Sequence, residues 1–316
     1  MDDKRFRIPP DWFQNTDIIY PMSEELPASA WHITPAIKSL HARGIDGRGV
    51  KVAVNDTAGQ ADHPFLPKQV AGKDFTSSQY GLRDTHGHGT HCQGIVISVA
   101  PGVEPITAKV LGDSGSGSTT GINAGRVWAA QQGADIISES LGDGGGPPIS
   151  ADLAAYDKAY EAGVSICNAA LGNAGYNGSG STIGRPGSYS SHNHGIAAIQ
   201  SDWRTIAGFS SGGPQARFAT PGAGIVSCKP GGGWVNMSGT SMACPWKAGA
   251  DALVLNWRRR LGLPTMQGPK DWSDWYVNNG LTIDLGAPGW DPRAGNGLID
   301  FVKVIDFLLA NTPENV

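Results

Sequence analysis

The sequence has little charge of either sign, few cysteines and no long apolar run. Charged residues make up only 16% of its 316 residues, and 24 basic against 28 acidic side chains leave a net charge of −4. This balance offers no basic field for nucleic acid or an anionic membrane, so we expect neither as a partner. No run of about 18 apolar residues is available to span a bilayer.

Export signals and metal motifs are also missing. The N-terminal residues lead into Ile8-Pro9-Pro10 and not into the apolar core of a secretion signal. The four cysteines, at positions 92, 167, 228 and 244, lack the spacing of a zinc site, so no metal is expected there. Their even number allows two disulfides, but reduced thiols are the favoured interpretation. We expect a cytoplasmic protein, or a secreted one where a leader has been removed.

Glycine, by contrast, is abundant. The 45 glycines predict many tight turns and close backbone approaches. Residues 1–35 contain five prolines and show no period, so they are interpreted as an N-terminal extension with a candidate regulatory role. Residues 36–316 carry the periodic patterns and are expected to form one domain that includes the C-terminal helices.

Beyond Val50, apolar runs alternate with helical patterns. The expected strands are 50–55, 106–111, 135–140, 164–170 and 195–200. The expected helices are 88–99, 121–133, 150–162, 241–260 and 300–309. Apolar strands that alternate with helices predict an α/β fold with a mainly parallel sheet and helices on both faces. Ligands of such sheets bind beyond the carboxyl ends of the strands.

Three segments far apart in the sequence carry the groups of an activated serine nucleophile. A carboxylate, Asp56, follows an expected strand in Val-Ala-Val-Asn-Asp. An imidazole, His88, opens an expected helix in His-Gly-His-Gly-Thr-His. A hydroxyl, Ser241, lies in Gly-Thr-Ser-Met-Ala-Cys-Pro, where a glycine-rich turn enters another helix.

The proline of the third segment indicates where its helix begins. Proline has no backbone N–H and is tolerated in the first helical turn, so Pro245 places the helix start close to Ser241. The hydroxyl and N–H of Ser241 then face the positive end of the helix, which favours a developing oxyanion. Taken alone, a serine at this place is equally well explained as an ordinary N-cap.

Neighbouring side chains compete with two of these candidates. Asp62 is expected in a loop and not beside the imidazole. His91 falls one turn into the helix, where a structural hydrogen bond is the favoured interpretation, and His86 is expected to be solvated. Asp84 precedes the helix and is expected to cap it.

Asn173 follows a glycine beyond the expected strand 164–170. Its side-chain amide is suited to donate a hydrogen bond to an oxyanion. The alternative is an asparagine in a left-handed turn. Its place at the carboxyl end of a strand favours the first interpretation.

In the order Asp, His, Ser these segments resemble the subtilisin-like serine proteases, the subtilases of peptidase family S8, over about residues 47–300. The resemblance implies a three-layer subtilisin-like fold and peptide-bond hydrolysis through an acyl-enzyme without a cofactor. It implies a triad of Asp56, His88 and Ser241, with Asn173 as oxyanion donor. The expected partner is a peptide or an unfolded protein, and the oligomeric state stays open.

The resemblance also implies a substrate cleft. An edge strand should pair with the peptide, a second segment should flank its other side, and small residues should line the pocket for the side chain before the scissile bond. In that order, the implied residues are Gly115, Ser116 and Gly117, then Ser140, Leu141 and Gly142, then Ala170, Gly172 and Gly184. Asp143 stands where glycine is usual; it either favours basic substrate residues or is solvated, and the second is favoured. Arg185 leaves a similar ambiguity.

Other departures from the family concern calcium. Family members bind calcium through aspartates at the positions of Phe65 and Arg217, and the loop with further ligands is missing. An apolar ring and a guanidinium supply no oxygen ligand, so we expect both usual calcium sites to be lost. Ala58 also departs from the family, because it places a methyl group where the turn after Asp56 usually has glycine.

The segment from Phe6 to Pro10 resembles the extension of intracellular subtilisins, which implies that it blocks the active site until it is removed. Two other functions are alternatives to a protease. An amine that intercepts the same acyl-enzyme would make the protein a peptide ligase or macrocyclase, although the short spacing between Asp56 and His88 leaves little room for an inserted cap. A non-catalytic binding protein on this fold is the second alternative, and the retention of all four catalytic groups argues against it.

Overall fold

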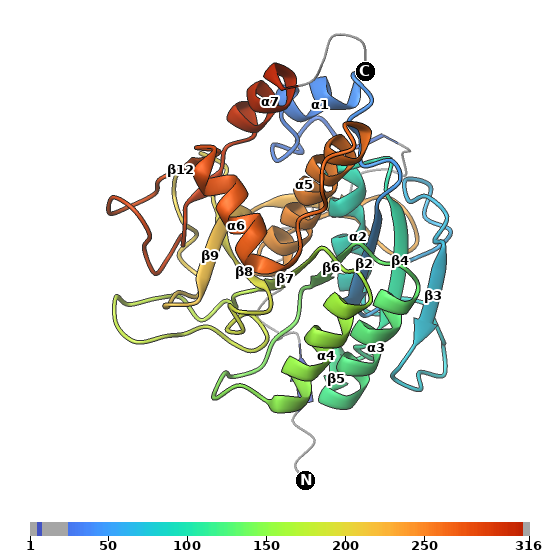
Figure 1. Cartoon of the computed structure of the whole chain (residues 1–316). Coiled ribbons are helices and arrows are strands. Elements are labelled where there is room, and N and C mark those ends of the chain that lie inside the picture. The colour runs from blue at the N-terminus through green and yellow to red at the C-terminus, as the bar shows by residue number, and fades with distance from the viewer. Residues whose placement is uncertain (1–4, 8–24, 312–316) are drawn as a thin grey trace.

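A nine-stranded sheet crosses the computed structural model, which describes residues 5–7 and 25–311 (Figure 1). Its strand order is β12-β13-β9-β8-β7-β6-β2-β4-β3. All neighbours pair in parallel except β12 and β13, which confirms the mainly parallel sheet. The strands are β2 (Lys51–Asp56), β3 (Ala71–Asp74), β4 (Glu104–Lys109), β6 (Ile136–Glu139), β7 (Ile166–Ala170), β8 (His194–Ile199), β9 (Ala216–Pro221), β12 (Thr282–Ile283) and β13 (Leu298–Ile299).

Helices cover both faces of this sheet, so the molecule has three layers (Figure 1). The larger apolar core lies on one face and takes in α1 (Pro35–His41), α2 (His88–Val99), α5 (Thr240–Arg260), α6 (Gly268–Asn278) and α7 (Phe301–Ala310). A second core lies on the opposite face, under α3 (Thr119–Gln131) and α4 (Ser150–Glu161). The expected three-layer α/β fold is therefore confirmed.

All ten expected strands and helices are present, with boundaries shifted by at most two residues. The sequence did not indicate β3, β9, β12 and β13 of the sheet, or the antiparallel hairpin of β10 (Ile225–Cys228) and β11 (Trp234–Met237). These segments are short, and several of them, such as Ala-Gly-Lys-Asp in β3, contain no apolar run. Pairing with a neighbouring strand, and not local preference, makes them extended.

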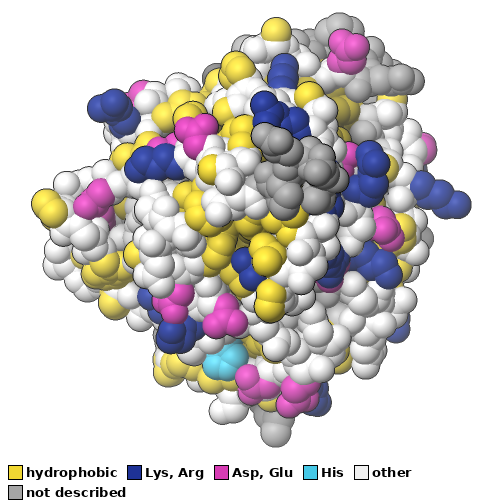
Figure 2. Space-filling model, turned by 45° about the horizontal axis from the view of Figure 1, so that its top comes forward, with side chains coloured by type: hydrophobic (Ala, Val, Ile, Leu, Met, Phe, Trp, Pro, Cys, Tyr) yellow, Lys and Arg dark blue, Asp and Glu magenta, His cyan; other side chains and the backbone are white. Residues whose placement is uncertain are grey.

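The distribution of charged side chains on the surface and the state of the four cysteines can be compared with the expectations from composition. On the face shown in Figure 2, basic and acidic side chains are interspersed among uncharged ones. No helix in residues 25–311 combines the length and the apolar character that crossing a membrane would require. All four cysteines are buried and none of them forms a disulfide in this structure.

Helix α5 passes through the larger core, and its residues 240–257 are all buried. Inside it, Lys247 forms an ion pair with Asp251, and both side chains are fully buried. Asp251 also accepts hydrogen bonds from Asn168 Nδ2 and from the hydroxyl of Tyr276, each at 2.9 Å. Burial lowers the pKa of Lys247, and the negative charge of Asp251 opposes that shift. The pair is tolerated because every charge in it has a close partner.

Removal of one partner should therefore destabilise the protein strongly. We expect Asp251→Ala to lower the free energy of unfolding by about 3–5 kcal/mol, because it leaves a buried ammonium without a counter-charge. The matched control is Asp274→Ala, which breaks the Lys270–Asp274 pair at the same helical spacing on the exposed face of α6 and should cause no measurable change. Denaturant unfolding of both variants measures the difference, and equal stabilities would contradict the expectation.

Candidate active site

Asp56 and His88 meet at the carboxyl end of the sheet, where β2 ends and α2 begins. His88 Nδ1 lies 2.8 Å and 3.0 Å from the two carboxylate oxygens of Asp56. Both side chains are buried, and the N–H of Thr57 donates to Asp56 Oδ1 at 2.7 Å, which fixes the carboxylate. A carboxylate bound to Nδ1 orients the ring and leaves Nε2 as the basic nitrogen.

The backbone of Ser241 is held by elements outside its own helix. Helix α5 starts at Thr240, which confirms the expected start beside Ser241, but Pro245 lies inside the helix and not in its first turn. Because proline has no N–H, the carbonyl of Ser241 lacks its helical partner. That carbonyl instead accepts from Ser140 Oγ at 2.8 Å and from Cys92 Sγ at 3.4 Å. The segment after β6 and helix α2 therefore both fix the position of the serine.

Cys92 connects this serine with the imidazole. Its Sγ lies 3.8 Å from His88 Nδ1 while it donates to the carbonyl of Ser241. Burial and the charge of Asp56 raise the pKa of Cys92 well above its ordinary value, so the thiol stays neutral. Among the described residues, Asp56, His88 and Cys92 are also the one group of three possible metal ligands close enough together to share an ion. The carboxylate of Asp56 and Nδ1 of His88 already bond to each other.

The orientation of Asn173 is set by Thr240. Asn173 Oδ1 accepts from the backbone N–H and from the hydroxyl of Thr240, both at 2.9 Å. The amide nitrogen is thereby turned toward Gly239: a Cβ added to this glycine would lie 3.1 Å from Asn173 Nδ2 and 3.6 Å from the backbone nitrogen of Ser241. The glycine leaves open a small space that two nitrogen donors border.

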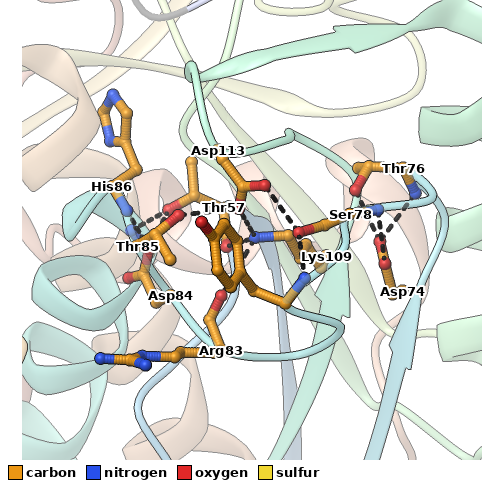
Figure 3. A network of polar contacts seen from close by, with 12 residues as sticks. Thr57, Asp74, Thr76, Ser78, Arg83, Asp84, Thr85, His86, Lys109 and Asp113 are labelled. Atoms are coloured by element: carbon orange, nitrogen blue, oxygen red, sulfur yellow. Dashed lines mark hydrogen bonds and ion pairs between the residues drawn. The ribbon is translucent and has the colours of Figure 1, made fainter.

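A buried lysine that the sequence did not single out joins the loop that follows Asp56 to the loop that precedes His88 (Figure 3). Lys109 ends β4, and its Nζ donates to the carbonyls of Thr57 at 3.0 Å and Arg83 at 3.2 Å. The third donor goes to Asp113 Oδ1 at 3.0 Å. All three N–H donors of the ammonium are thus used. The only local signal was a single charged residue within the expected strand 106–111.

Asp84 caps α2, as expected. Its Oδ1 accepts from the N–H of Gly87 at 2.8 Å and from the hydroxyl of Thr57 at 3.0 Å, and its Oδ2 accepts from the N–H of Thr90 at 2.8 Å. The hydroxyl oxygen of Thr57 in turn accepts from the N–H of Gly89 at 2.9 Å. The end of β2 and the start of α2 are therefore locked together.

The competing side chains take other roles. His91 is fully buried, and its Nε2 bonds to the carbonyls of Ile225 and Val235 at 3.1 Å each, which confirms a structural role. Asp62 is exposed in its loop. His86 is half-buried and not fully solvated, and a Cβ added to Gly115 would lie only 2.7 Å from its Nε2.

A cleft of about 910 Å³ opens beside Asn173. Of the residues that the resemblance assigned to the substrate, five line it: Ser116, Gly142, Ala170, Gly172 and Gly184. Gly117 belongs to the short strand β5 (Ser116–Ser118), and Gly115 precedes it. The side chain of Ser140 is buried against the carbonyl of Ser241, and that of Leu141 is buried in an apolar cluster with α3 residue Ile122.

Asp143 belongs to the wall of this cleft, but its carboxylate is not solvated. Its side chain is only 8% exposed and forms an ion pair with Arg185, whose side chain is 3% exposed. The favoured interpretation of Asp143 as a solvated residue is therefore wrong. Burial alone would lower the pKa of Arg185, but the hydrogen bonds and charge of Asp143 outweigh it and raise the pKa above its ordinary value.

The departures at Phe65, Arg217 and Ala58 each have a local structure. The ring of Phe65 packs against Trp234, with 4.9 Å between the ring centroids. Arg217 donates from its guanidinium to the carbonyl of Ser190 at 3.3 Å. Ala58 has φ +112°, a conformation that strains a residue with a Cβ. The side chains of Phe65 and Arg217 are thus engaged in packing and in a hydrogen bond.

The strand β1 (Arg5–Arg7) lies against the cleft edge. It pairs antiparallel with β5, with Phe6 opposite Gly117 and Arg7 opposite Ser116. The following residues Ile8, Pro9 and Pro10 lie outside the described residues. The strand that was expected to pair with substrate is therefore paired with the N-terminal segment.

Comparison with known proteins agrees with this geometry. The model of the Subtilase family, peptidase S8, matches residues 47–297. Subtilisin DY of Bacillus licheniformis is 41% identical over 234 residues, which cover 70% of this chain and 83% of the relative. Subtilisin Savinase of Lederbergia lenta is 36% identical over 272 residues, which cover 83% of this chain and 93% of the relative. For subtilisin E of Bacillus subtilis (strain 168) the identity is 38% over 69% of this chain, and the match spans 58% of that relative's length. The chain belongs to the subtilase family and is a serine endopeptidase of the subtilisin type.

Proposed function

We propose that Asp56, His88 and Ser241 form the catalytic triad of this endopeptidase. The observation that carries the proposal is the buried Asp56–His88 pair, with Cys92 in contact both with His88 and with the backbone of Ser241. Ser241 Oγ attacks the carbonyl carbon of the scissile peptide bond, and His88 Nε2 takes the hydroxyl proton. His88 then returns this proton to the leaving amine, and water releases the acyl group by the reverse route. Asp56 keeps the imidazole oriented and stabilises its protonated form.

The oxyanion of the tetrahedral intermediate is assigned to the space beside Gly239. Asn173 Nδ2 and the N–H of Ser241 border that space, and the hydrogen bonds from Thr240 hold the amide in place. Donors that are already oriented stabilise developing charge without reorganisation during the reaction. The first turn of α5 adds the positive end of the helix dipole.

The peptide substrate is assigned to the cleft and its edge. An extended peptide adds to β5 through backbone hydrogen bonds, on the side where β1 pairs in this structure. The side chain before the scissile bond enters the space lined by Ala170, Gly172 and Gly184. Ser140 and Leu141 support this site from the interior of the protein, since both side chains are buried.

We propose that residues 1–35 are an extension that regulates the peptidase domain of residues 36–316, and that β1 is the inhibiting part. β1 and an extended substrate would compete for the same edge of β5. The end of the extension is packed with the domain: Trp31 Nε1 donates to the carbonyls of Ala223 and Gly224, and Trp246 Nε1 donates to the carbonyl of His32. Removal of β1 alone therefore tests the inhibition without disturbing these contacts, whereas removal of the whole extension would break them.

The proposed reaction needs no cofactor, because the nucleophile, the base and the oxyanion donors all come from the chain. The usual calcium sites are proposed to be replaced by packing at Phe65 and by the guanidinium at Arg217. Neither side chain offers the hard oxygen ligands that calcium requires.

A reducing, cytoplasmic compartment is proposed for this enzyme. The support comes from the four free thiols at positions 92, 167, 228 and 244, all of them buried. Proteins of reducing compartments keep their thiols unpaired.

Loss of the proposed nucleophile should abolish activity. Ser241→Ala should lower kcat for a peptide substrate by at least about a thousandfold, because no other group forms the acyl-enzyme. A fluorophosphonate should label the unaltered protein at Ser241 and fail to label the variant, as read by mass spectrometry. Ser191→Ala, which changes an exposed serine before β8, at the amino end of the strands, should leave both measurements unchanged. Labelling that persists in Ser241→Ala would refute the assignment.

Deletion of residues 1–7 should raise kcat/KM for a short peptide by about tenfold or more. The physical reason is that a tethered strand competes at an effective concentration near the millimolar range. A synthetic peptide of residues 1–7, added to the shortened protein, should inhibit it competitively. An unchanged kcat/KM after deletion would show that β1 does not compete with substrate.

Calcium removal should not alter stability. We expect the Tm with excess EGTA to agree within about 1 °C with the Tm in millimolar calcium, because a site that binds no ion adds no linkage term to folding. A fall of several degrees on chelation would mean that a calcium site exists after all. Differential scanning calorimetry provides the measurement.

A further inference from the structure

The cleft wall contains one charged side chain, Asp143, among otherwise uncharged lining residues. Its partner Arg185 lies next to Gly184 of the same cleft. Arg185 Nη2 donates to Asp143 Oδ2 at 2.5 Å, and Arg185 Nε donates to Asp143 Oδ1 at 3.2 Å. This is a bidentate pair, in which both oxygens of the carboxylate face the guanidinium.

The backbone holds the pair in place. The N–H of Asp143 donates to the carbonyl of Arg185 at 3.0 Å, and the N–H of Arg185 donates back to Asp143 Oδ1 at 3.2 Å. The N–H of Gly145 also donates to Asp143 Oδ1, at 2.8 Å, and Arg185 Nη1 donates to the carbonyl of Pro147 at 3.1 Å. A Cβ added to Gly184 would lie 2.4 Å from the carbonyl oxygen of Asp143, so the segments that carry Asp143 and Arg185 pack against each other through backbone atoms.

This arrangement decides which charge the cleft presents. An ionised carboxylate that is nearly buried in the wall of a cleft attracts a cation unless it already has one as a partner. Arg185 supplies that cation from within the chain. The rest of the lining consists of glycine, alanine, apolar, hydroxyl and amide residues, which are suited to uncharged groups.

We propose that Arg185 is a specificity-determining residue: it masks Asp143, so that the cleft selects an uncharged side chain before the scissile bond and discriminates against lysine and arginine. The proposal rests on the assignment of this cleft to the substrate. It predicts that either half of the pair, once unmasked, attracts a substrate residue of opposite charge. A cation that entered beside the intact pair would meet the guanidinium as well as the carboxylate and would gain little.

The test compares three peptides that differ only in having leucine, lysine or glutamate before the scissile bond. Each kcat/KM is expressed per active site, titrated with a fluorophosphonate. The unaltered protein should prefer leucine. Arg185→Gln should raise the lysine-to-leucine ratio of kcat/KM by about tenfold or more, and Asp143→Asn should raise the glutamate-to-leucine ratio by a similar factor. The double variant Asp143→Arg with Arg185→Asp restores a pair and should return the preference to leucine.

The control is Arg259→Gln, which breaks an arginine–aspartate pair with Asp135 outside the cleft and should leave all ratios unchanged. If Arg185→Gln is too unstable to purify, Asp143→Asn tests the proposal by itself, because it keeps an acceptor oxygen for Gly145. Ratios that stay within about twofold of the unaltered protein in the purified single variants would overturn the proposal while leaving the peptidase assignment intact. Failure of the unaltered protein to cleave any of the peptides or to react with the fluorophosphonate would instead count against the proposed function.

Discussion

The carbonyl oxygen of Ser241 is the point on which the arrangement of the site depends. Pro245 removes the helical hydrogen bond that this oxygen would otherwise accept. Ser140 and Cys92 supply two replacements from elements far away in the sequence. Because Pro245 has no N–H, the carbonyl of Ser241 is available to these two donors. The first turn of α5 is thereby connected to the end of β6 and to α2, whose first residue is His88. If Ser241 is the nucleophile, as proposed, a backbone held in this way needs little reorganisation during the reaction.

A sequence with few charges places several of them in its interior as close pairs. Lys247 and Asp251 lie inside α5, and Arg126 of α3 pairs with Glu139 of β6. The buried Lys109 reaches the partly exposed Asp113. Buried pairs add little net stability over apolar packing, because desolvation offsets the attraction. Lys109 has a geometric role, because it joins the loop that follows Asp56 to the loop that precedes His88.

The cleft brings two kinds of recognition to one place. Its edge, β5, pairs with β1 in this structure, and in the proposed function an extended substrate would pair with the same edge. In the proposed function its pocket distinguishes side chains, and Asp143, paired with Arg185, lies in the wall of that pocket. Backbone pairing does not depend on which side chains the paired chain carries, so selectivity among substrates has to come from the pocket. An inhibitory strand that uses only the edge is therefore compatible with any preference in the pocket.

Local pattern determined much of this protein. The alternation of apolar strands with helices predicted the three-layer fold, and turn chemistry around Asp56, His88, Asn173 and Ser241 predicted the candidate site, because both signals lie within a few neighbouring residues. What the tertiary structure decided lies between distant segments: the Lys109 contacts, the partners of the Ser241 carbonyl, the pairing of β1 with β5, and the masking of Asp143. A single side chain such as Asp143 has the same local sequence whether it is solvated or paired. Only the fold, which brings Arg185 to it from more than forty residues away, determines which of these it is.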